Sequence, residues 1–207
     1  MRGQRGRAGR TAAVRVNTVS THTGMWRERL GALRWTSLSL LVILIDQVTK
    51  AIVMAKISLY EIVTVLPVLE FTQLHNTGAA FSFLAGASGW QRYFFIVLAA
   101  VVSLAILVWL KQIDPRRQRL LAIGLTLILG GALGNVVDRA WLGYVIDFIH
   151  FHWGDAYFAA FNLADSAITV GAGLLILDAI LESRRHKREA RAAPLAPQGD
   201  KAVSDEP

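Results

Sequence analysis

Four long apolar segments, separated by more polar ones, dominate the pattern of this chain. They cover about residues 33–55, 93–110, 120–137 and 161–181, and the second carries no charged residue. Each approaches the length of about 20 residues that an α-helix needs to cross the hydrocarbon core of a bilayer. The pattern therefore predicts four transmembrane helices.

The two longer connections between these runs do not have the composition of plain linkers. Residues 63–83 are rich in β-branched and aromatic side chains and contain the turn signal Asn76-Thr77-Gly78. Residues 145–151 alternate as a strand does. We expect an all-α membrane protein with four transmembrane helices and a small extracytoplasmic β-sheet segment.

Composition supports this fold class and excludes several kinds of chemistry. Hydrophobic residues make up 54% of the 207 residues and charged residues only 18%, which is typical of a membrane protein. The chain has no cysteine, so it has no disulfide, thiol nucleophile or thiolate metal site. The net charge of +7 comes from clusters beside the apolar runs. We interpret these clusters as a topology signal and expect no nucleic-acid partner.

The distribution of basic residues predicts an orientation. Residues 1–34 contain eight arginines, four basic residues lie between the second and third runs, and six follow the fourth. The connections 56–92 and 138–160 contain only three together. Because cytoplasmic loops carry the excess of Lys and Arg, both termini and the 111–119 loop are expected in the cytoplasm. The two connections then face outward.

The two ends of the chain lack the apolar pattern. Residues 1–24 are rich in Arg, Gly, Ala and Thr, and we expect a disordered basic extension. A transit peptide, or a true start at Met25, are the alternatives. Residues 25–188 are expected to form the membrane domain and residues 189–207 a disordered tail. A signal peptide is not expected, because the first run keeps Asp46 and Lys50.

Polar residues gather at the outward ends of the predicted helices, where they would form one layer. Asp46 and Lys50 are spaced as an intrahelical ion pair, and the adjacent Asp138 and Arg139 are also expected to pair. Topology brings these residues together with others from the third and fourth runs and from the outer connections: Asn76, Asn135, Asp147, Asn162 and Asp165.

Asp147 and Asp165 are the strongest catalytic candidates in this layer. Neither has a basic neighbour in the sequence, and an apolar strand face would raise the pKa of Asp147. Two such carboxyl groups sharing a proton supply one base for water and one acid for a carbonyl. Amide hydrolysis requires that division. A pairing of Asp138 with Asp165 stays open.

The sequence gives weaker support for a metal site, for a serine protease and for functions other than catalysis. His150 and His152 are expected to point to opposite faces of a strand, no His-Glu-x-x-His motif occurs, and we expect no metal site. The segment Gly86-Ala87-Ser88-Gly89 resembles a rhomboid motif, but no later spanning helix supplies a histidine base. A small transporter relaying protons through its carboxylates, or a structural subunit held by polar contacts, are the alternative functions.

At these residues the chain resembles the lipoprotein signal peptidases, signal peptidase II, of bacteria. The match covers about residues 35–182 and runs through five motifs: Asp46-Gln47-Val48-Thr49-Lys50, Asn76-Thr77-Gly78-Ala79-Ala80-Phe81-Ser82, Gly130-Gly131-Ala132-Leu133-Gly134-Asn135-Val136-Val137-Asp138-Arg139, Val145-Ile146-Asp147-Phe148 and Phe161-Asn162-Leu163-Ala164-Asp165-Ser166.

The resemblance implies an aspartic endopeptidase of the inner membrane that removes signal peptides from prolipoproteins before a diacylglyceryl-modified cysteine. It implies that Asp147 and Asp165 are catalytic and that the active site lies near the periplasmic face. It also implies no cofactor, lipidated prolipoproteins and membrane lipid as partners, and a monomer. Other matching residues would bind substrate or support the site: Asp46, Lys50, Asn76, Gly78, Asn135, Asp138, Arg139 and Asn162.

Overall fold

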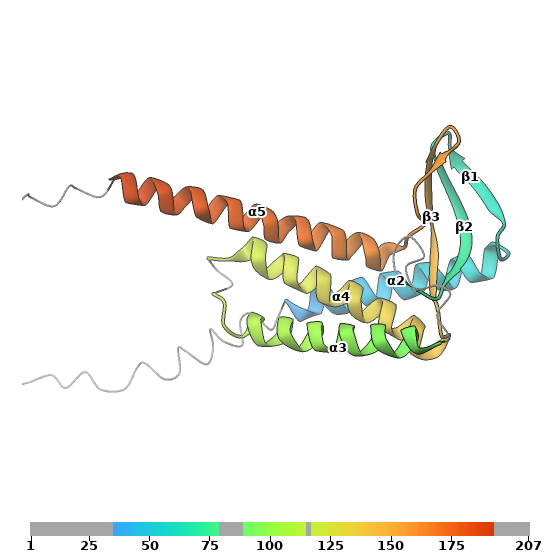
Figure 1. Ribbon diagram of the computed structural model, residues 1–207, viewed down its shortest axis with the longest axis horizontal. Helices are drawn as coiled ribbons and strands as arrows, with labels where there is room; N and C mark the ends of the chain where they lie inside the picture. Colours follow the sequence, from blue (N-terminus) through green and yellow to red (C-terminus); the bar gives the residue numbers. More distant parts are fainter. Residues whose placement is uncertain (1–34, 79–88, 115–116, 193–207) are drawn as a thin grey trace, which may run out of the picture.

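Four helices and a small sheet make up the described part of the chain. The computed structural model describes residues 35–78, 89–114 and 117–192. The helices are α2 (Thr36–Lys56), α3 (Trp90–Leu110), α4 (Arg119–Trp141) and α5 (Leu163–Ala192). All four are long and apolar enough to cross a membrane, which confirms the predicted membrane fold. Figure 1 shows them side by side, with the sheet at one end of the bundle.

Helix α4 is the central helix of the bundle. In the most apolar stretch of α4, 56% of the residues are buried inside the protein. In the corresponding stretches of the other three helices, at most 22% are buried. Close approach to α2 depends on small residues: a Cβ added at Gly130 would lie 2.8 Å from the Ser39 carbonyl oxygen, and one at Gly134 would lie 2.8 Å from the Asp46 carboxylate. The small residues Gly130 and Gly134 thus allow α4 to pack closely against α2.

Helix α5 is longer than its apolar run. We expected the helix to end near residue 181 and the tail to be disordered from residue 189, but the helix continues to Ala192. The expectation is wrong for residues 189–192. An ion pair one turn apart, Arg185 with Glu189 at 3.0 Å, favours the helix there. The predicted disorder of residues 1–24 and 193–207 lies outside the described residues.

The four strands form one antiparallel sheet in the order β1-β2-β3-β4. They are β1 (Ile62–Leu66), β2 (Leu69–Asn76), β3 (Val145–Trp153) and β4 (Ala156–Tyr157). The register of β2 and β3 places Leu74 opposite Asp147 and Asn76 opposite Val145. The sheet therefore joins the two long connections between helices, and it brings Asn76 beside Asp147.

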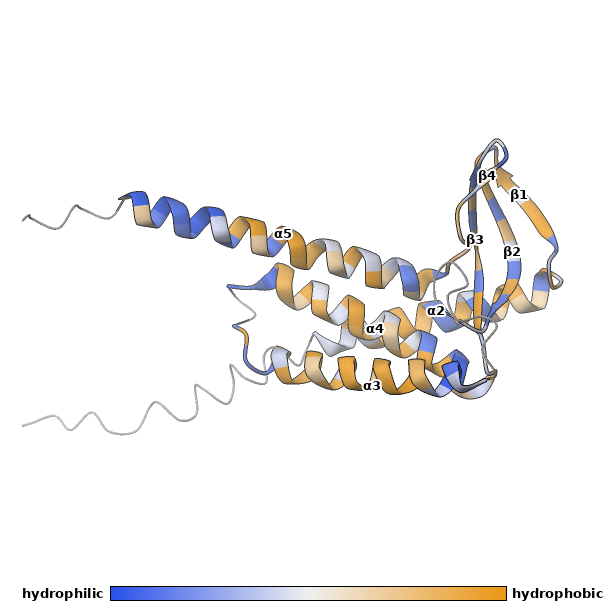
Figure 2. Ribbon diagram, viewed as in Figure 1, coloured by the Kyte–Doolittle hydropathy of each residue, from blue (hydrophilic) through white to orange (hydrophobic). Residues whose placement is uncertain are grey.

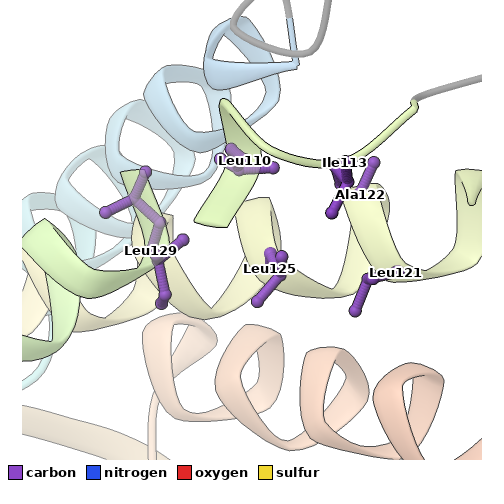
Figure 3. Close-up of a cluster of buried hydrophobic side chains, with 7 residues drawn as sticks. Leu110, Ile113, Leu121, Ala122, Leu125 and Leu129 are labelled. Carbon is purple, nitrogen blue, oxygen red and sulfur yellow. The ribbon is translucent and has the colours of Figure 1, made fainter. Parts of the chain in front are cut away.

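Two apolar clusters hold the bundle and the sheet in place. At the end away from the sheet, side chains from α3, the following loop and α4 interlock (Figure 3): Ile106, Leu110, Ile113, Leu121, Ala122, Leu125 and Leu129. At the other end, Val53 of α2 and Ile57, which directly follows α2, pack against Phe148 of β3. Since Phe148 follows Asp147 directly, the second cluster fixes the strand on which Asp147 lies.

Candidate active site

Asp147 lies on β3 in a buried, hydrogen-bonded position. Its side chain is 3% exposed, and its neighbours Val145, Ile146 and Phe148 are also buried. The Asn162 side-chain amide donates to Oδ1 at 2.7 Å, and the Asn76 side-chain amide donates to Oδ2 at 2.8 Å. Both carboxylate oxygens are thus oriented by neutral donors.

The environment of Asp147 favours its protonated form. Burial, followed by the negative charge of Asp165, raises the pKa of Asp147 from 3.8 to about 7. The hydrogen bonds from Asn76 and Asn162 oppose this rise in pKa. The upward shift of the Asp147 pKa agrees with the expectation from the sequence. At neutral pH this carboxyl group can therefore gain or lose a proton.

Asp165 lies in the first turn of α5, where it forms a reciprocal cap with Asn162. The backbone N–H of Asp165 donates to Asn162 Oδ1 at 2.9 Å, and the backbone N–H of Asn162 donates to Asp165 Oδ2 at 3.3 Å. This pattern satisfies free N–H groups at a helix start. The Asn135 side-chain amide donates to Asp165 Oδ1 at 2.8 Å. Asp165 is therefore fixed from both α4 and its own helix.

Beneath the two aspartates lies a buried ionic cluster, which we define as Asp46, Lys50 and Asp138. Lys50 Nζ lies 2.8 Å from Asp46 Oδ2 and 2.7 Å from Asp138 Oδ2. It also donates to Asn135 Oδ1 at 3.1 Å. Asp46 accepts the backbone N–H of Ala164 at 3.0 Å, and Asp138 accepts that of Ile146 at 3.3 Å. The cluster thus ties down the residues that precede both Asp165 and Asp147.

One expected ion pair is confirmed and the other is wrong. Asp46 and Lys50 pair along α2 as predicted. Asp138 pairs with Lys50 rather than with its neighbour Arg139, because the close approach of α2 and α4 brings the two side chains together. Gln47, which was not among the predicted site residues, donates to Asp138 Oδ1 at 2.8 Å. Because Gln47 directly follows Asp46, its place in the sequence could have indicated that it belongs to the site.

Arg139 instead connects α4 to the segment after β2. Its Nη2 donates to the Gly78 carbonyl oxygen at 2.8 Å, and its guanidinium lies 4.9 Å from the centre of the Phe95 ring. Gly78 in turn donates its backbone N–H to Asn76 Oδ1 at 2.9 Å. The guanidinium Nε is buried and has no hydrogen-bond partner among the described residues. Arg139 therefore offers a cation beside the two aspartates.

These polar groups line one end of a cavity of about 660 Å³. The sequence identified five of its polar lining residues: Asn76, Asn135, Arg139, Asp147 and Asp165. It did not single out the wall built by Phe158, Phe161, Ile168 and Val170. Such residues give no local signal as cavity walls, because apolar side chains are common throughout this chain. The cavity joins two carboxylates and a cation to an apolar surface.

The histidine expectation needs a correction. His150 and His152 lie on the same face of β3, because side chains two residues apart on a strand share a face. Both face Glu70 of β2, at 3.9 and 3.5 Å, and both stack on Tyr157. Within residues 35–78, 89–114 and 117–192, no group of three His, Cys, Asp or Glu side chains is arranged to hold a metal. The Gly86–Gly89 segment lies outside these ranges.

Comparison with known proteins gives the family. The family model described as signal peptidase (SPase) II matches residues 38–181. A lipoprotein signal peptidase of Pseudomonas aeruginosa is 51% identical over 168 residues, which is 80% of this chain and 96% of that protein. One of Shewanella pealeana is 47% identical over 163 residues, covering 79% and 94%.

A solved structure has the same fold. It is described as a bacterial membrane enzyme determined by the in meso method at 2.3 Å resolution. It superposes with a TM-score of 0.66 at 29% identity and covers 79% of this chain and 94% of the other. The family model matches a range that includes residues of all four helices, and the relatives are about 50% identical to this chain. This chain therefore belongs to the signal peptidase II family of multi-pass membrane peptidases.

Proposed function

We propose that this protein is an aspartic endopeptidase that removes signal peptides from prolipoproteins by cleaving before the diacylglyceryl-modified cysteine. The observation that carries the proposal is the pair formed by Asp147 and Asp165. Both line one cavity, and Asn162 contacts both. Asp147 and Asp165 are the catalytic residues in this account.

The reaction follows from one proton shared by two carboxyl groups. With its pKa raised to about 7, Asp147 holds the proton in the resting site, and the Asp165 carboxylate acts as the base. Asp165 takes a proton from water as the water oxygen attacks the scissile carbonyl carbon, while Asp147 donates its proton to the carbonyl oxygen. Asp165 then gives its proton to the amide nitrogen, Asp147 takes a proton from a hydroxyl of the tetrahedral intermediate, and the C–N bond breaks. The products are a carboxylic acid and an amine, and the pair again holds one proton.

The remaining polar residues orient the pair and the substrate. Asn135 and Asn162 fix the carboxylates through their side-chain amides. Arg139 lines the cavity, and its guanidinium is suited to bind a backbone carbonyl oxygen of the substrate. The ionic cluster acts from below as support.

The apolar wall of the cavity suits a lipidated substrate. Phe158 lies before α5, and Ile168 and Val170 extend the cavity along α5, which is one of the spanning helices. Acyl chains on the substrate cysteine contribute about 0.8 kcal/mol per buried methylene and hold the scissile bond at a fixed depth. A bond at the membrane surface is then within reach of Asp147 and Asp165.

We further propose that the protein lies in the bacterial inner membrane with both termini in the cytoplasm and the site near the periplasmic face. The excess of basic residues near both termini and in the 111–119 loop supports this orientation. We also propose a monomer, as the family resemblance implies. Residues 25–188 suffice for the peptidase domain, so that residues 1–24 are dispensable for cleavage.

The direct test of the proposed substrate is a cleavage assay with purified protein in detergent. One precursor carries the diacylglyceryl group on its cysteine, and a second precursor of identical sequence does not. Cleavage of the lipidated precursor alone, at the bond before the cysteine, is the expected result. Equal turnover of both precursors would contradict the role given to the acyl chains.

A further inference from the structure

The last three turns of α5 extend beyond the rest of the bundle. The helix has 30 residues, about 45 Å at 1.5 Å per residue, whereas the hydrocarbon core is about 30 Å thick. About ten residues must therefore lie outside that core. Figure 1 shows this end of α5 projecting past α3 and α4, and Figure 2 shows that its outermost turns are hydrophilic.

The charges on this projection are divided between two faces. One face carries a cationic stripe, which we define as Arg184, Lys187, Arg188 and Arg191, spaced at i, i+3, i+4 and i+7. All four side chains are exposed and together line a hollow of about 340 Å³. In the part of the chain that the structure describes, none of the four forms an ion pair, whereas the neighbouring face pairs Arg185 with Glu189 and His186 with Glu182. Within the described part of this projection, only the stripe presents positive charge without an ion pair.

We propose that the cationic stripe binds anionic phospholipid headgroups at the membrane surface opposite the sheet. Arg184 is three residues beyond the apolar run that ends at residue 181, so it lies about 5 Å past the core, and Lys187 and Arg188 lie about 9 to 11 Å past it. The headgroup layer extends about 7 Å beyond the core on each side. The first three cations therefore lie at or just beyond the depth of the phosphate groups.

Charge complementarity favours a lipid over a soluble partner. Each basic residue near an anionic leaflet strengthens the attraction of the protein to that leaflet about fivefold. The stripe lies on a helix that is already anchored in the bilayer, so the protein loses no translational freedom when it binds lipid. Binding at this end also sets the axial position of α5, whose first turn holds Asp165. The stripe thus supports the depth of the site from the other end of the same helix.

The test measures lipid selectivity in the intact protein. Full-length protein is reconstituted in phosphatidylcholine vesicles with a trace of spin-labelled phosphatidylglycerol or spin-labelled phosphatidylcholine, and the motionally restricted fraction of each label is compared. The expected result is at least a fivefold preference for phosphatidylglycerol, which falls as salt is raised. This salt dependence needs no variant. Absence of a preference in the wild-type protein would overturn the proposal.

Two matched variants locate the preference. R184Q/K187Q/R188Q removes three stripe cations and is expected to abolish most of the preference for phosphatidylglycerol. K111Q/R117Q/R119Q removes three cations at the same end of the bundle and is expected to keep most of it. An equal loss in both variants would show an effect of net charge alone and overturn the stripe as a site. A short RNA that displaces the labelled lipid from the wild-type protein would equally count against a lipid site.

Discussion

A single side-chain amide, that of Asn162, joins Asp147 to the helix that carries Asp165. Its Nδ2 donates to Asp147 Oδ1 at 2.7 Å, while its Oδ1 accepts the backbone N–H of Asp165 at 2.9 Å. Asn162 is fully buried, so both bonds are protected from water. The relative placement of the two carboxylates therefore depends on the residue at which the chain enters α5.

The pH dependence of cleavage should follow the pair. One proton on two carboxyl groups predicts a bell-shaped profile of kcat/KM whose two apparent pKa values belong to the pair. Since the pKa of Asp147 is raised to about 7, the rate should fall as pH rises through about 7 and the last proton leaves.

Asn76→Leu tests the assignment of that alkaline limb. Asn76 donates to Asp147 at 2.8 Å and thereby lowers its pKa, so loss of this donor should move the limb to higher pH.

The raised pKa of Asp147 also predicts how thermal stability depends on pH. The folded pKa exceeds the unfolded value of 3.8, so Asp147 withdraws stability as pH rises from about 4 through 7. Asp147→Asn should therefore melt above wild type at pH 8 but not at pH 4. A limb that moves to lower pH in Asn76→Leu would refute the assignment.

The ionic cluster predicts an asymmetry between two lysines of α2. Lys50→Met leaves the buried Asp46 and Asp138 without a counter-charge and should reduce the free energy of unfolding by about 3 to 5 kcal/mol. Lys56 is exposed at the end of the same helix, and Lys56→Met should change it by less than about 0.5 kcal/mol. Adding Asp46→Asn and Asp138→Asn to Lys50→Met should recover part of the loss. Equal melting temperatures for the two single variants would disprove the cluster's role.

Helix contact predicts a second asymmetry, between two glycines. A Cβ at Gly131 of α4 would overlap the Ala164 carbonyl oxygen at the start of α5, whereas one at Gly173 of α5 would meet nothing within 4 Å. Gly131→Ala should therefore destabilise the protein by about 1 to 3 kcal/mol and reduce cleavage, because α4 and α5 carry Asn135 and Asp165. Gly173→Ala should be neutral or slightly stabilising in thermal melts. Equal effects would argue against close packing of α4 on α5.

The local features of this fold could be predicted from the sequence, including the Asp46–Lys50 pair within one helix, but the partners of charges from different helices could not. Apolar runs and strand alternation depend on neighbouring residues, so the four helices and the strand at Asp147 were predicted. The partner of Asp138 is Lys50, 88 positions away, and the pairing depends on the approach of α2 to α4 at Gly130 and Gly134. The extension of α5 to Ala192 was missed because hydropathy alone does not register ion pairs along a helix.

The orientation of the chain is tested by reporter fusions. The distribution of basic residues predicts that fusions at residue 114 and after residue 190 report the cytoplasm, and that fusions near residues 86 and 154 report the outside. Alkaline phosphatase and a cytoplasm-active reporter at each site provide opposite readouts. A single fusion on the unexpected side would contradict the proposed orientation of the site.

The most direct measurement of the central claim is the single-turnover cleavage rate of a lipidated precursor by Asp147→Asn and Asp165→Asn, with substrate binding and melting temperature measured in parallel. Asn keeps the shape of Asp but cannot take a proton from water, so each variant should bind substrate and stay folded while cleavage falls by a factor of about 10⁴ or more. Asp138→Asn is the matched control, because Asp138 pairs with Lys50 below the site, and it should lower the melting temperature while retaining measurable cleavage. Full cleavage by either Asp147→Asn or Asp165→Asn, or its abolition by Asp138→Asn in a well-folded protein that still cleaves without Asp147, would contradict the assignment.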